Sequence, residues 1–267
     1  MTTSRRRWLR FSLQALLVLL TAVCVLLGLV AQRMRRGVAQ KRTVAAILAA
    51  GGHVAYSYQL DERGNETPDA EAPIPAWLLP LGLDTFFHVT AVHVDRNADL
   101  TPERRARLCE GFRALPHLRD LQLYDIDFTE ANFACLRFLV DLESLSLDSC
   151  TLKDAWIEHL PKGGRLKHLN CDRTAIGDDG LAHLAGQSGL TALSVRSTFV
   201  TDEGLGHLLG LPLEDLDLSH NAITDRGLGI LEECSTLHRL LIGGGPGVSD
   251  EAVRALTIAV PGLAIPR

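Results

Sequence analysis

The sequence predicts an α/β solenoid, in which short parallel strands form one face and helices cover the other, with an N-terminal transmembrane helix ahead of it. The first observation is a Leu-x-x-Leu-x-Leu phrase, or a close variant, that recurs every 23 or 24 residues and begins at Leu118, Leu142, Leu166, Leu190, Leu213 and Leu237. A fixed period of this length is typical of stacked units that bury their apolar faces only against their neighbours. The second observation is an uncharged run of 21 residues, 11–31, between two groups of arginines.

One repeat shows how each unit is built. Leu193 and Val195 alternate with polar residues, which predicts a short strand with these two side chains facing inward. Thr201 is a predicted helix N-cap, because its hydroxyl can accept a hydrogen bond from a free backbone N–H of the first turn. Leu205 and Leu208 lie three residues apart and therefore share the helix face that points to the same core. Each repeat is expected to hold one strand and one helix.

Two further features recur with the leucines. An Asp-x-Gly-Leu phrase begins at Asp178, Asp202 and Asp225. The position three residues after the last apolar strand residue holds Ile126, Cys150, Thr174, Thr198, Asn221 and Gly245 in turn.

Together these patterns resemble the leucine-rich repeat family over residues 88–267, and the Asp-x-Gly-Leu phrase resembles bacterial membrane-anchored members. In that family the third position after the strand usually holds Asn, Cys or Thr, which bonds the backbone of the turn. Ile126 and Gly245 depart from this pattern, so we expect the two ends of the array to be less regular. The resemblance implies parallel strands on a concave face, helices on a convex face, and binding of proteins at the concave face.

The expected organisation has four parts. A basic tail covers residues 1–10, a transmembrane helix residues 11–31, a juxtamembrane helix and N-terminal cap residues 32–87, and the repeats residues 88–267. The cap is expected because the first repeat of a solenoid needs a cover for its core. Within it, residues 38–50 predict a helix that stops at Gly51, and residues 53–58 alternate like a strand.

Charge is divided unevenly along the chain. Residues 1–42 hold nine Arg or Lys and no acidic residue, and the remainder holds 18 basic against 32 acidic residues, a net charge of about −14. An acidic repeat domain argues against a nucleic-acid partner, since phosphate binding needs a positive surface.

The uncharged run is long enough to cross a membrane as a helix. A cleaved signal peptide is the alternative, but the apolar stretch is too long for one and Leu29-x-Ala31 is a poor cleavage site. We therefore expect a single-pass protein of the cell membrane with an uncleaved signal-anchor. Four arginines before the run favour the N-terminus inside and the repeats outside. Basic residues after the run and unpaired cysteines point the other way, so the side of the repeats stays open.

The sequence predicts no enzyme, cofactor or metal site. Cys135, His159, His183 and His207 recur at 24-residue spacing and resemble a zinc set by residue type. Equivalent positions in neighbouring repeats stack about 5 Å apart, so the four side chains form a line about 15 Å long. Zinc ligands must instead converge to about 2 Å from one ion. No Gly-rich phosphate loop, nucleophile elbow or His-Glu-x-x-His motif occurs.

The outward strand residues differ from repeat to repeat and are the candidate binding surface. The residues predicted to contact a protein partner are Gln122, Tyr124, Ser146, Asp148, Asn170, Asp172, Ser194, Arg196, Asp217 and Arg239. Tyrosine and arginine are over-represented at interface hot spots. The first hypothesis is a binding module for an unidentified protein. Two alternatives are a structural protein that tethers an envelope complex through the solenoid edges, and a cytoplasmic adaptor that presents substrates to another enzyme.

Overall fold

The structure is a computed structural model that describes residues 13–61, 67, 70–75, 82–95, 100–244 and 247–266. The expected basic tail, residues 1–10, lies outside the described residues, as does the turn residue Gly245.

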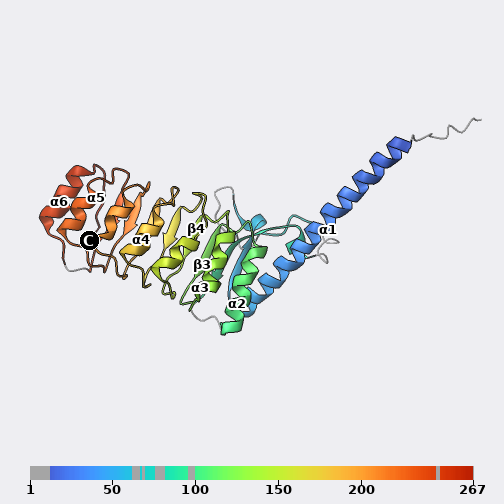
Figure 1. Cartoon of the computed structure of the whole chain (residues 1–267), viewed down its shortest axis with the longest axis horizontal. Helices are drawn as coiled ribbons and strands as arrows, with labels where there is room; N and C mark the ends of the chain where they lie inside the picture. Colours follow the sequence, from blue (N-terminus) through green and yellow to red (C-terminus); the bar gives the residue numbers. More distant parts are fainter. Residues whose placement is uncertain are drawn as a thin grey trace, which may run out of the picture.

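All named strands belong to one eight-stranded sheet whose order in space follows the order along the chain (Figure 1). The strands are β1 His53–Tyr56, β2 Val89–Val94, β3 Asp120–Leu123, β4 Ser144–Ser146, β5 His168–Asn170, β6 Ala192–Ser194, β7 Asp215–Asp217 and β8 Arg239–Leu241. β1 runs antiparallel to β2, and every later pair of neighbours is parallel. The strands predicted from the leucine phrase are confirmed.

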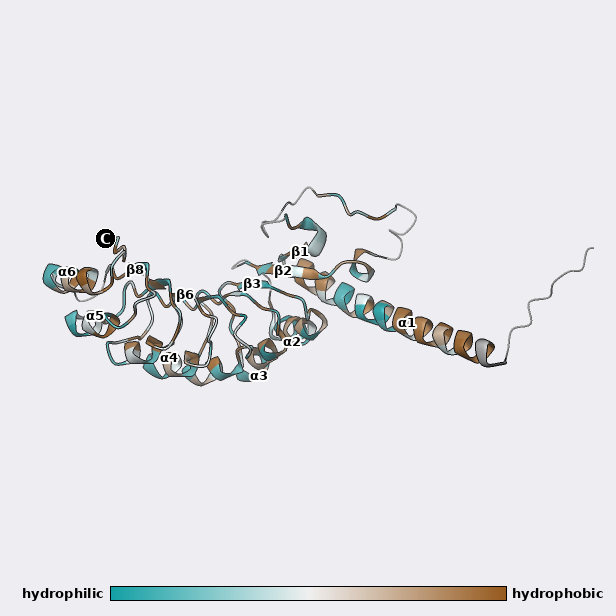
Figure 2. Cartoon of the chain, turned by 90° about the horizontal axis from the view of Figure 1, so that it is seen from above, coloured by the Kyte–Doolittle hydropathy of each residue, from teal (hydrophilic) through white to brown (hydrophobic). Residues whose placement is uncertain are grey.

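Helices follow the outer curve of the solenoid, and the strands follow its inner curve (Figure 2). The α-helices are α1 Leu13–Ala49, α2 Pro102–Gly111, α3 Glu130–Phe133, α4 Asp178–Leu184, α5 Asp225–Leu231 and α6 Asp250–Ala259. The 3-10 helices are η1 Ser57–Gln59, η3 Leu83–Thr85, η4 Phe112–Ala114, η5 Ala134–Phe138, η6 Asp154–His159 and η7 Gly204–Leu208.

The helices of the repeats are shorter and tighter than the sequence suggested. A unit of 24 residues leaves only five to seven for the convex side in the repeats of η6, α4, η7 and α5. A 3-10 helix rises about 2.0 Å per residue against about 1.5 Å for an α-helix, so it covers the distance with fewer residues. The Thr201 hydroxyl accepts from the Glu203 N–H at 3.3 Å, as predicted, but η7 begins only at Gly204, with Glu203 at the N-cap position.

The core is one continuous stack of leucines between strands and helices. The central strand leucines pair in register, as in Leu145 with Leu169 and Leu193 with Leu216, and all of them are at most 2 % exposed. Because each inward residue packs against its equivalent in the next repeat, every repeat adds one more layer of leucines to the same core.

The turn position after each strand acts as the resemblance implied. The Asn221 amide donates to the carbonyl oxygens of Val195 at 2.7 Å and Leu218 at 3.1 Å, and the Cys150 thiol donates to the Leu123 carbonyl at 3.4 Å. Ile126 offers no polar group and is simply buried, while its own N–H donates to the Cys150 sulfur. This turn lacks the side-chain bond of the later ones, but its backbone does not differ, since Asp125 adopts the same positive φ as Ser149 and Arg173.

A second ladder explains the Asp-x-Gly-Leu phrase. The Asp202 carboxylate accepts from the backbone N–H of Thr224 at 2.9 Å and from its hydroxyl at 2.5 Å. The carboxylate passes so close to the next helix that a Cβ on Gly227 would lie 2.3 Å from Asp202 Oδ1. Asp178 makes the same two bonds to Thr201 and lies as close to Gly204. The aspartate of one repeat therefore ties down the loop of the next, and the glycine makes room for it.

The first helix joins two parts that the sequence analysis kept separate. α1 runs without a break from Leu13 to Ala49, across the boundary expected at residue 31, and projects from the N-terminal end of the solenoid (Figure 1). Its second half is the cap: Ile47 is fully buried, and the Gln40 amide donates to the Phe87 carbonyl at 2.8 Å. Gly37 permits this packing, because a Cβ there would lie 3.0 Å from the backbone of Thr85.

Candidate functional site

Outward side chains form three rows across the sheet from β3 to β8. The strand register aligns the first row, Asp120, Ser144, His168, Ala192, Asp215 and Arg239, and the second row, Gln122, Ser146, Asn170, Ser194, Asp217 and Leu241. The third row follows directly after the strands and comprises Tyr124, Asp148, Asp172, Arg196 and Ser219. The ten predicted contact residues are divided among these rows, five in the second, one in the first and four in the third.

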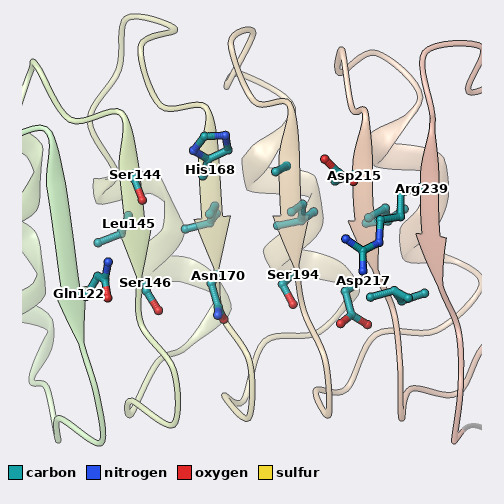
Figure 3. Close-up of a pocket in the computed structure, with 15 residues that line it drawn as sticks. Gln122, Ser144, Leu145, Ser146, His168, Asn170, Ser194, Asp215, Asp217 and Arg239 are labelled. Atoms are coloured by element: carbon teal, nitrogen blue, oxygen red, sulfur yellow. The ribbon is translucent and has the colours of Figure 1, made fainter. Parts of the chain in front are cut away.

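A hollow of about 360 Å³ lies over the middle of the sheet (Figure 3). It takes in six of the ten predicted residues, namely Gln122, Ser146, Asn170, Ser194, Asp217 and Arg239. The hollow exists because the outward residues of β4 and β6 are small, with Ser144 on one strand and Ala192 on the other, between the larger side chains of the flanking strands.

Several lining residues were missing from the predicted set. Ser144, His168, Asp215 and Leu241 line the hollow as well. The period of two along each strand does place all four on the outward face, but they were not among the ten residues predicted to contact a partner. Ala192 could not be predicted in this way, because the apolar alanine side chain suggests a core position although it faces outward.

The third row is largely engaged within the protein. Asp148 is 9 % exposed, forms an ion pair with Arg173, and accepts from the Ser149 hydroxyl at 2.9 Å. Asp172 Oδ1 accepts from the backbone N–H of Arg196 at 2.9 Å and from the Ser194 hydroxyl at 2.5 Å. These carboxylates hold the loops that follow the strands. They shape the edge of the concave face more than they offer free charge to a ligand.

A chain of polar contacts closes the N-terminal side of the hollow. The Tyr124 hydroxyl donates to Gln122 Oε1 at 3.2 Å, and Gln122 Nε2 donates to Asp120 Oδ1 at 3.3 Å. Because three consecutive outward side chains of one strand bond to each other, this wall is pre-positioned.

The cysteines and histidines give no sign of covalent or metal chemistry. The neighbouring Cys109 thiol and burial raise the pKa of Cys135, a proximity that the spacing of the cysteines did not suggest. Burial likewise raises the pKa of Cys150 to about 12, so both thiols stay protonated at neutral pH. Among the described residues no group of three or more His, Cys, Asp and Glu side chains could hold a metal ion, and His159 instead faces Glu130 at 3.7 Å. What the concave face presents is a fixed polar surface with a hollow at its middle.

Comparison with known proteins adds a likeness of fold. No family model and no curated protein matches this sequence. The chain is similar to the crystal structure of an internalin C2 from Listeria monocytogenes, with 22 % sequence identity and a TM-score of 0.47 over 64 % of this chain and 76 % of that one.

Proposed function

We propose that the chain is a membrane-anchored leucine-rich repeat protein whose concave face binds a protein partner. The observation that carries this proposal is the hollow of about 360 Å³ on a sheet whose strands are held by a continuous apolar core. Mechanistically, the core fixes the strands, and the polar residues that differ from repeat to repeat select the partner.

The membrane part of the proposal rests on α1. This helix is long and apolar enough to cross a membrane by length and composition, and its apolar side chains from Leu16 to Val30 are exposed. Directly after them, Arg33 Nε donates to the Thr85 carbonyl at 2.9 Å, and Arg33 Nη2 donates to the Phe86 carbonyl at 3.1 Å. A cleavage after Ala31 would cut inside one continuous helix, next to a contact that holds the cap. We therefore favour a retained anchor over a cleaved signal sequence.

Two measurements test the anchor and its orientation. The mass of the mature chain, isolated from membranes, should include α1. Protease added to intact cells should digest the repeats if the N-terminus lies inside, as the basic residues before the span suggest. Repeats that are protected from the protease would show the opposite orientation. A mature chain that begins near residue 32 would show that the helix is cleaved off and that no anchor is retained.

Site-specific photocrosslinking tests the concave face. A benzoylphenylalanine at Ser194 or Asn170, inside the hollow, should give an adduct of defined mass with the partner in living cells. The same probe at Glu158, an exposed residue on the convex side, is the matched control. Adducts from Glu158 alone would move the binding surface to the convex side.

A second candidate, self-association through the C-terminal edge, is favoured by one observation. Residues 263–265 continue the sheet beyond β8, since the Leu240 N–H donates to the Ala264 carbonyl at 2.9 Å and Ala264 bridges to Arg239 in parallel. Ile258 of α6, the last helix before this edge, is 81 % exposed. Ile258→Asp should leave the mass in solution of the purified full-length protein unchanged if binding occurs on the concave face. It should shift that mass to the monomer if the edges associate.

A further inference from the structure

The charges around the hollow are unevenly distributed. Asp215 and Asp217 of β7 both line it, two positions apart and on the same side of the strand (Figure 3). Arg239 extends from β8 back over β7 and lies between the two carboxylates. Among the described residues no ion pair within 4.0 Å joins Arg239 to either aspartate, and this end of the hollow holds two negative charges and one positive charge.

The two carboxylates differ from the aspartates of the third row. Asp148 and Asp172 already accept bonds from neighbouring repeats, whereas Asp217 accepts one bond at its Oδ1, from the backbone N–H of Ser219 at 2.8 Å, and Asp215 is exposed. The exposed Asp215 carboxylate and the second oxygen of Asp217 are therefore available to a ligand. A purely apolar ligand would cover both carboxylates without pairing them, which is unfavourable.

The remaining lining matches an extended chain with a long side chain. Leu241 forms an apolar wall beside Asp217, and Ala192 with the small serines leaves space above the sheet. Lysine and arginine side chains combine an apolar stem with a charged head, and they commonly bury the stem while the head reaches a polar partner.

We propose that the hollow receives a lysine or arginine side chain from an extended segment of the partner protein, with Asp215 and Asp217 holding its charged head. This inference rests on the proposed binding role of the concave face and specifies the chemistry of the partner. Arg239 competes with the incoming cation for the same two carboxylates, and so it weakens the binding of any basic residue that lacks further contacts with the sheet.

Four short peptides test the proposal directly. The probes are Gly-Ser-Xaa-Ser-Gly with both ends blocked, in which Xaa is lysine, arginine, norleucine or glutamate. The protein is the full chain in nanodiscs of zwitterionic phosphatidylcholine, which does not attract basic peptides. Dissociation constants come from saturation-transfer NMR titrations. The lysine and arginine peptides should bind about tenfold more tightly than the norleucine peptide, as expected for two partly exposed ion pairs.

Three variants link any preference to the hollow. The double substitution Asp215→Asn with Asp217→Asn should remove the preference for basic peptides. Glu158→Gln with Asp179→Asn makes the same charge change at two exposed positions outside the hollow and should leave the preference intact. Arg239→Gln removes the competing cation and should tighten binding of the lysine peptide several-fold.

The opposite results would overturn the proposal. If the glutamate peptide binds best and Arg239→Gln abolishes its binding, the hollow recognises a carboxylate and the basic ligand is rejected. If the lysine and norleucine peptides bind equally, the two aspartates have no role in recognition. If no peptide binds while the probe at Ser194 still gives its adduct, the basic ligand is rejected and the concave face is retained as the binding surface.

Discussion

The two halves of the solenoid have the same backbone plan but are held together by different chemistry. In the C-terminal part of the array, from Asp154 to Ser249, a carboxylate of each unit bonds the loop of the next, and Gly180, Gly204 and Gly227 make room for it. In the N-terminal repeats the corresponding positions hold larger side chains, and the contacts between units are aromatic and ionic.

Rings replace the carboxylate ladder in the N-terminal half. Phe133 packs against Phe128 edge to face at 5.7 Å and against Trp156 at 5.9 Å between ring centroids. Trp156 occupies the repeat position that Gly180, Gly204 and Gly227 hold further along the chain. A glycine therefore accompanies each incoming aspartate, whereas the bulky Trp156 stands at the equivalent position where no aspartate arrives.

The strand entries of the N-terminal half carry ion pairs between neighbouring units. Lys167 pairs with Glu143 at 2.7 Å, and Asp141 bridges Arg165 at 2.7 Å and His117 at 3.0 Å. Each pair joins residues 24 positions apart. These contacts are partly exposed, so we expect the ring packing to contribute far more to stability than the ion pairs do.

Removing the central ring should have the largest effect. Phe133 is fully buried, and Phe133→Ala should lower the free energy of unfolding by about 3–5 kcal/mol, through lost burial and the cavity that remains. Hydrogen exchange on the full chain in detergent micelles would locate the loss. Protection should fall in α3, η5 and η6 and persist in α4 to α6. A uniform loss along the chain would show that the two halves unfold as one unit.

Adding a side chain at Gly227 should have the next largest effect on stability. Gly227→Ala places a methyl group against Asp202 and should cost about 1–3 kcal/mol. Gly229→Ala, in the same helix, has nothing within 4 Å and should be neutral or slightly stabilising.

A double-mutant cycle identifies the cause of that cost. On an Asp202→Ala background the clash is absent, so Gly227→Ala should lose most of its effect. Equal costs on both backgrounds would mean that the glycine is needed for another reason, and the ladder would not explain the Asp-x-Gly-Leu phrase.

A gain of stability is expected at the turns of either half. Asp125, Ser149, Arg173, Ser197 and His220 adopt positive φ angles of 53–59° immediately before the turn position of their repeats. Ser197 is exposed, and Ser197→Gly should stabilise the chain by up to about 1 kcal/mol, since glycine adopts this conformation without steric cost. Arg173→Gly relieves the same conformation but removes the ion pair with Asp148, so it should gain less. Denaturation midpoints of the two variants would show whether this difference exists.

The smallest effect is expected from lowering the pH, which weakens the ion pairs between repeats. A hydrogen bond from Lys167 holds the pKa of Glu143 below its ordinary value of 4.5. A lowered pKa means that the pair contributes fully above that value and loses its contribution as the pH falls through the folded-state pKa. Glu143→Gln should therefore reduce the decline in stability below about pH 4.5, by less than about 1 kcal/mol. Glu158→Gln, at an exposed site, should leave the decline unchanged, and equal effects of both variants would assign the decline to general charge.

Most of the fold could be predicted because strand and core positions depend on local periodicity. Leu193 and Val195 read as inward residues from their spacing alone, and both are buried. The helices were predicted less well, since the space left in each unit, and not the sequence pattern, decided between α4 and the 3-10 helix η7. The sequence predicted that the ten candidate residues face the same side of the sheet. It did not predict that six of them line the hollow while the four of the third row lie outside it.

The sequence by itself determined the period, the inward leucines and the outward residues, because each follows from spacing within a single strand. Only the tertiary structure decided which outward residues remain free. Asp148 and Asp217 are both outward aspartates of the predicted contact set, yet Asp148 meets Arg173 of the next repeat while Asp217 lines the hollow. Such contacts join residues 22–25 positions apart and depend on how neighbouring units stack, which no local pattern records. The same reason applies to α1. Its two halves read as separate helices in the sequence, because the contacts of the second half with Thr85 and Phe87 join residues far apart in the chain.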